Sequence, residues 1–155
     1  FDEILELAAA ASKARGRAIG VYPETKHPSY CAQIGLPHEA PLLAALERFG
    51  MTERTSPVFI QSFEVGNLQA LRSKTKVRLI QLIEEDGHPA DRPDLATAQM
   101  ISPAGLADIA RYADGIGPDK SLIIPRDAQG NLTCPTPLVQ NAHAVGLQVH
   151  PWTFR

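Results

Sequence analysis

Residues 58–83, which read VFIQSFEVGNLQALRSKTKVRLIQLI, contain the repeating unit from which the fold can be predicted. The run 58–63 is apolar and rich in β-prone side chains, which is typical of a strand. A stretch with leucines at helical spacing follows at 64–74, and a second apolar run lies at 77–83. Two such strands joined by a helix lie parallel in one sheet, so this stretch predicts a β-α-β unit.

The same alternation extends along the chain in both directions. Further helices are predicted at 1–13, 38–49, 102–112 and 137–145, further strands at 18–26, 114–118 and 147–153, and loops at 27–37, 84–99 and 121–134. The order is one helix, four strand-helix units and a last strand, which predicts a parallel α/β sheet. No Gly-x-Gly-x-x-Gly motif follows any strand, which weakens a dinucleotide-fold interpretation. In a (β/α) barrel the strand ends would build the site.

Composition limits the class of protein. The chain has 155 residues, of which 44% are hydrophobic, and is long enough for one domain with a sizeable core. Its net charge of −2 argues against nucleic acid held by bulk electrostatics, and no apolar run predicts a transmembrane segment. Cys31 and Cys134 could be free thiols or one disulfide. Both chain ends look cut, because Phe1 opens inside a helix and Arg155 lies just beyond a strand.

Residues 20–26, GVYPETK, place a carboxylate and an ammonium two positions apart at a strand end. Side chains two apart in an extended chain point the same way, so we expect Glu24 and Lys26 to face one site. Glu24 is a hard oxygen ligand suited to calcium or magnesium, and Lys26 could balance phosphate charge. The alternative is a plain ion pair of Lys26 with Glu24 or Glu64, and spacing alone does not separate the two interpretations.

Two aromatic side chains also follow strands. Phe63 could form an apolar wall of a site or pack in the core, and Trp152 could present a flat face to a small polyol or pack under a loop. The five histidines are scattered without a transition-metal spacing, and we expect His150 to be buried rather than catalytic. The absence of a Gly-x-Ser-x-Gly motif argues against serine hydrolase chemistry.

Four segments together resemble the glycerophosphodiester phosphodiesterase family: residues 20–26 (GVYPETK), 58–63 (VFIQSF), 112–118 (YADGIGP) and 149–155 (VHPWTFR). They occur in the family's order with fitting gaps. The Tyr-Pro-Glu-x-Lys and Ala-Asp-Gly-Ile-Gly-Pro forms are most similar to the periplasmic bacterial branch. The resemblance covers the whole chain but only an internal portion of the family's domain.

The resemblance implies an α/β fold of the (β/α)8 TIM-barrel type, of which residues 1–155 would supply strands three to seven and be truncated at both ends. It implies hydrolysis of small glycerophosphodiesters to glycerol 3-phosphate and an alcohol, with a divalent metal, calcium or alternatively magnesium. Glu24 would be one metal ligand, Lys26 would contact the phosphate, and Phe63 and Trp152 would line the glycerol side. A periplasmic location is implied, with the cytoplasm as the alternative, and a homodimer is left open.

The chain departs from the family pattern in what it lacks. The family's two acid-base histidines and its other two metal carboxylates belong to segments expected upstream of Phe1, so no catalytic residue is assigned in this portion. The isolated portion is therefore expected to be inactive. Two alternatives stay open: a related barrel phosphodiesterase of the sphingomyelinase D or phosphatidylinositol phospholipase type, and a catalytically dead barrel that serves as a binding module.

Overall fold

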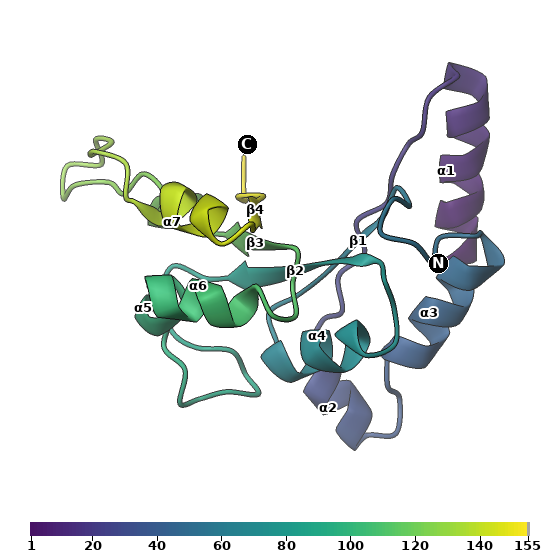
Figure 1. Cartoon of the computed structure of the whole chain (residues 1–155), viewed down its shortest axis with the longest axis horizontal. Helices are drawn as coiled ribbons and strands as arrows, with labels where there is room; N and C mark the ends of the chain where they lie inside the picture. The colour runs from purple at the N-terminus through teal and green to yellow at the C-terminus, as the bar shows by residue number, and fades with distance from the viewer. Residues whose placement is uncertain (155) are drawn as a thin grey trace.

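The computed structural model describes residues 1–154, so Arg155, the last residue of the fourth matching segment, lies outside the described residues. The helices are α1 (Asp2–Arg15), α2 (Pro28–Gln33), α3 (Glu39–Arg48), α4 (Val65–Arg72), α5 (Thr97–Met100), α6 (Pro103–Ile109), the 3-10 turn η1 (Lys120–Leu122) and α7 (Leu138–Ala144). Figure 1 shows α1 and α3 at one end of the molecule and α7 at the other, with the sheet between them. The five predicted helices are present as α1, α3, α4, α6 and α7, in the predicted order.

One parallel sheet joins the strands β1 (Phe59–Ser62), β2 (Arg78–Ile83), β3 (Gly115–Pro118) and β4 (Gln148–Val149). Their order in the sheet is their order in the chain, and every neighbouring pair is parallel. Each connection crosses over through at least one helix, as parallel neighbours require. The carboxyl ends of all four strands therefore lie at the same edge of the sheet (Figure 1).

The first predicted strand, 18–26, is not a continuous strand. Val21 and Glu24 each form an isolated parallel bridge, to Val58 and Gln61. The amide groups of Val21 and Thr25 donate into this ladder, but Pro23 between them has no N–H to donate. The ladder thus loses one hydrogen bond at the proline and resumes after it, which keeps Glu24 beside the sheet.

The expectation of an irregular loop at 27–37 was wrong, because this stretch contains the six-residue helix α2. Pro28 occupies the first turn of the helix, where its missing N–H costs nothing. His27 precedes it in the left-handed region, with φ of 47°, and turns the chain from the strand-like segment into the helix. In the same way, part of the polar stretch 84–99 is helical, since α5 begins at Thr97.

The two faces of the sheet are packed differently. The face that meets the helices carries most of the core, with Leu5, Leu46, Ile60, Leu68, Leu79, Leu106, Ile116 and Leu138 almost fully buried. On the other face, Ile80 and Leu82 of β2 lie against two glycines of β3. A methyl group added at Gly115 would lie 2.7 Å from the backbone carbonyl oxygen of Gln148, so the close approach of β4 favours glycine at this position.

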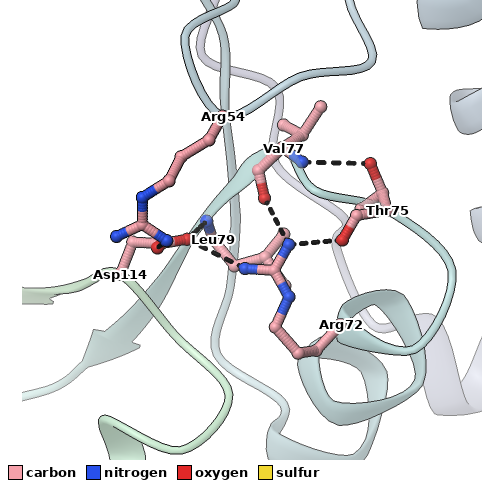
Figure 2. Close-up of polar contacts among 6 residues, drawn as sticks. All are labelled: Arg54, Arg72, Thr75, Val77, Leu79 and Asp114. Atoms are coloured by element: carbon pink, nitrogen blue, oxygen red, sulfur yellow. Dashed lines mark hydrogen bonds and ion pairs between the residues drawn. The ribbon is translucent and has the colours of Figure 1, made fainter.

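The buried carboxylate of Asp114 links the amino ends of β2 and β3. The Asp114 side chain is 4% exposed and forms ion pairs with Arg54 and Arg72, and its Oδ2 accepts a 2.8 Å hydrogen bond from the Leu79 amide. Figure 2 shows Arg72 turning from Asp114 to the carbonyls of Thr75 and Val77 as well. This network ties the start of β3 to β2 and α4, at the end of the sheet opposite the carboxyl ends.

Candidate functional site

A cleft of about 430 Å³ lies at the carboxyl ends of the segment 20–26, β1 and β2. Its lining includes Glu24, Thr25, Lys26, His27, Phe63, Glu64, Leu82, Glu84, His88 and Thr97. Most of these residues end a strand or begin the loop after it, which is where side chains gather in barrels of alternating strands and helices. The cleft therefore has both charged and apolar walls, on elements that the sheet holds in place.

Glu24 and Lys26 face this cleft together. The Lys26 ammonium lies 2.9 Å from Oε1 of Glu24, which confirms that the two side chains point the same way. The Glu24 side chain is 20% exposed, whereas that of Lys26 is 73% exposed. Glu24 thus contacts the ammonium at the tip of the Lys26 side chain, most of which is exposed to solvent. Of the two ion-pair partners that spacing left open, the structure selects Glu24 over Glu64.

Phe63 and Trp152 meet edge to face at the carboxyl ends of their strands, with ring centroids 5.8 Å apart. Phe63 lines the cleft, but Trp152 is not among its lining residues. The indole N–H of Trp152 donates to the Gly117 carbonyl at 2.7 Å, which fixes the ring against β3. Three of the four predicted site residues therefore share the cleft, and Trp152 reaches it only through Phe63.

Four further ionisable residues line the cleft without having been assigned to the site: His27, Glu64, Glu84 and His88. Glu84 directly follows β2, and Glu64 lies two residues after the end of β1, so the rule that sites gather at strand ends could have found them. The histidines lie on loops, where hydrophobic periodicity carries no signal. Glu64 is 3% exposed, and its Oε2 accepts a 2.9 Å hydrogen bond from the Ser29 amide. Its Oε1 has no hydrogen-bond partner among residues 1–154.

Aromatic and cationic side chains occupy the face of the sheet that carries Ile80 and Leu82. Nδ1 of His150 lies 2.8 Å from the Tyr22 hydroxyl, and both rings pack against Phe59. The Arg78 guanidinium lies over the Phe59 ring at 3.8 Å. Burial, with a smaller contribution from the Arg78 charge, lowers the pKa of His150. His150 is thus half-buried, less than the buried position expected from the sequence, and its ring packs against Phe59.

The described residues do not by themselves complete a metal site. Within residues 1–154, no three His, Cys, Asp or Glu side chains converge closely enough to hold a metal ion. Glu24 has the donor chemistry for a hard cation, but one carboxylate is a fraction of the six to eight oxygen ligands that calcium takes. Glu24 therefore fits such an ion only as one member of a larger set.

Two other sequence questions are answered by the structure. Cys31 and Cys134 are both free cysteines, so of the two alternatives the disulfide is wrong. Among the described residues, no helix combines the length and apolar character needed to cross a bilayer.

Comparison with known proteins gives the context of this cleft. The model of the family described as "Glycerophosphoryl diester phosphodiesterase family" matches residues 1–155. A glycerophosphodiester phosphodiesterase of Haemophilus influenzae is 25% identical over the whole chain, and glycerophosphodiester phosphodiesterase GDPD6 of Arabidopsis thaliana is 33% identical. The chain covers 47% and 44% of these two proteins, so it spans about half the length of the curated relatives it matches.

Solved structures support the fold. A protein of Silicibacter pomeroyi assigned as a glycerophosphoryl diester phosphodiesterase superposes with a TM-score of 0.67 over 99% of this chain and 45% of its own. A similarly assigned protein of Agrobacterium tumefaciens gives 0.56 over 96% of this chain and 50% of its own; both are 22% identical. The parallel sheet is thus part of a (β/α) barrel. The family model matches every residue of this chain, and the chain therefore belongs to the glycerophosphoryl diester phosphodiesterase family.

Proposed function

We propose that this chain is the part of a glycerophosphodiester phosphodiesterase that carries the phosphate-binding strand ends. The reaction would be hydrolysis of a glycerophosphodiester to glycerol 3-phosphate and an alcohol. The observation that carries the proposal is the pair of Glu24 and Lys26, 2.9 Å apart at a cleft walled by Phe63. Membership of the family supports it, since the relatives bear the name of this activity.

Lys26 is the residue of this chain suited to binding the phosphate. Its side chain is 73% exposed, and a compact cation beside a phosphoryl oxygen stabilises the negative charge that the reaction develops there. The ion pair with Glu24 limits the directions in which the lysine can point. Lys26 would thereby orient the diester as well as attract it.

Glu24 would contribute one oxygen ligand to a divalent cation, calcium or alternatively magnesium. Bound there, the cation would act as a Lewis acid toward the phosphoryl group. The remaining ligands and the acid and base that move protons would come from residues outside this chain. Phe63, braced by Trp152, would offer an apolar wall to the glycerol carbons.

Product analysis tests this proposal and separates its rivals. The native polypeptide is incubated with glycerophosphocholine and calcium, with and without a chelator. Release of glycerol 3-phosphate and choline that stops on chelation is expected. A cyclic phosphate product would instead assign a phospholipase-type or sphingomyelinase D-type reaction, and no turnover with any diester would identify a binding module.

The affinity of the protein for calcium tests the role of Glu24 as a metal ligand. Glu24→Gln keeps the shape of the side chain but removes its charge, so we expect weaker calcium binding by calorimetry. Glu53 is the matched control, since it also pairs with a lysine, Lys76, and its Glu53→Gln variant should bind calcium normally. Equal affinity of both variants would remove Glu24 from the metal site.

Location and assembly are proposed on the motif resemblance alone. A periplasmic location, with the cytoplasm as the alternative, is tested by cell fractionation of the native protein. A homodimer is tested by light scattering of the purified protein.

A further inference from the structure

Thr25 lies between the two charged residues of the candidate site and also borders the cleft. Neighbouring side chains in an extended segment alternate in direction, and the Thr25 hydroxyl turns toward α4 rather than toward Glu24 and Lys26. The residue is 4% exposed. Its contacts therefore decide how the backbone between the two charges is held.

A chain of buried side-chain hydrogen bonds starts at Thr25. Its hydroxyl donates to Oδ1 of Asn67 on α4 at 2.7 Å, and Nδ2 of Asn67 donates to Oε1 of Glu39 on α3 at 2.5 Å. A carboxylate only accepts hydrogen bonds, so Asn67 must turn its NH₂ group to Glu39 and its oxygen to Thr25. Only a hydroxyl donor at position 25 completes this chain.

The backbone on both sides of Thr25 is fastened as well. Its amide donates to the Gln61 carbonyl at 3.0 Å, and its carbonyl accepts from the Ser62 hydroxyl at 3.3 Å. Beyond Lys26, the Ser29 amide donates to the buried Glu64 carboxylate. These contacts matter because Pro23 has removed one hydrogen bond from the ladder that would otherwise hold this segment.

We propose that Thr25 and Asn67 are positioning residues, which fix the direction of Glu24 and Lys26 through the chain that ends at Glu39. Thr25 and Asn67 are both buried, so an arrangement that breaks their hydrogen bond leaves the Thr25 hydroxyl or the Asn67 amide oxygen without this partner, which is costly. The catalytic meaning of this inference rests on the proposed function, in which Lys26 orients the phosphate and Glu24 binds the cation. The structural part, that the network holds the segment 24–29, does not.

The test compares three variants of the native polypeptide. Thr25→Val has nearly the same volume but no hydroxyl, and Thr25→Ser keeps the hydroxyl. Thr75→Val is the matched control, because the Thr75 hydroxyl accepts from the Val77 amide at the opposite end of β2 (Figure 2). Amide hydrogen exchange is measured at Gln61 and Ser29, whose N–H groups bond to Pro23 and Glu64. For the same variants, kcat/KM is measured from the release of glycerol 3-phosphate.

Thr25→Val should speed exchange at both amides by about tenfold, because local opening becomes easier. It should also lower kcat/KM by about ten- to a hundredfold, since small misplacements of substrate-orienting groups are costly. Thr25→Ser should keep the exchange rates and kcat/KM close to those of the unmodified protein. Thr75→Val should leave both quantities unchanged.

Unchanged exchange in Thr25→Val would overturn the inference, and so would faster exchange with an unchanged kcat/KM. If the unmodified protein releases no glycerol 3-phosphate, the proposed function fails, while hydrogen exchange alone still decides whether the network holds the segment.

Discussion

At the scale of single residues, the contact between His150 and Tyr22 should make the stability of the folded protein depend on pH. Burial raises the pKa of Tyr22, so its hydroxyl keeps its proton and can donate to Nδ1 of His150. The guanidinium of Arg78 and the partial burial of the ring both disfavour a charged imidazole. The folded protein therefore holds His150 neutral at pH values where an unfolded chain would protonate it.

The stability of the protein should depend on this histidine below neutral pH. Because the folded pKa of His150 is lowered, the unfolded state binds more protons as the pH falls below about 6.5, and the free energy of unfolding decreases. The loss is at most about 1.4 kcal/mol per pH unit, and less because solvent screens the half-buried ring. Urea unfolding at two pH values, about 7.5 and 5.5, measures it.

The His150→Gln variant is the control for this prediction. Glutamine can accept the Tyr22 hydrogen bond but does not titrate, so its stability should fall less than that of the unmodified protein over the same interval. Equal losses in the two proteins would show that other groups cause the pH dependence.

The residue scale also shows what spacing can and cannot predict. The alternation of side chains along an extended segment placed Glu24 and Lys26 in one cleft, and the structure agrees. Spacing could not say whether Lys26 would choose Glu24 or Glu64, because that depends on where the Glu64 carboxylate turns. It turns to the Ser29 amide, on a helix that was itself predicted as a loop.

At the scale of elements, strands and longer helices could be predicted because burial imposes a period on their sequences. The short helix α2 could not, since its proline and serine are equally common in turns. Pro23 removes one donor from the ladder, yet the ladder resumes at Thr25 because parallel pairing uses alternate residues as donors. Single prolines therefore interrupt such a segment without releasing it from the sheet.

The Asp114 network should account for a large part of the pairing between β2 and β3. Asp114→Ala removes the partner of Arg72 and leaves the buried Leu79 amide unpaired, so we expect a loss of roughly 2–4 kcal/mol in unfolding free energy. Urea unfolding measures this loss. Asp108→Ala is the control, since Asp108 is exposed and pairs only loosely with Arg111; a similar loss in both variants would contradict a special role for Asp114.

At the scale of the whole molecule, the sequence predicted a parallel α/β sheet, which is confirmed. It also predicted a site at the carboxyl edge of the sheet, where the structure has a cleft. The chain covers about half of its curated relatives, and its own residues supply one carboxylate and one cation at that edge. A single hard-ligand side chain cannot reveal a whole coordination sphere. The metal and the proton carriers therefore stay proposals that rest on the motif resemblance and not on local geometry.

The proposed function depends most on Lys26, which would bind the phosphate of a glycerophosphodiester. Lys76 is a close control, because it too pairs with a glutamate and its side chain is 74% exposed, against 73% for Lys26. The decisive measurement is kcat/KM for glycerol 3-phosphate release by the Lys26→Gln and Lys76→Gln variants of the native polypeptide. We expect a drop of about a hundredfold for Lys26→Gln and none for Lys76→Gln; equal activity of the two variants would show that Lys26 does not bind the phosphate.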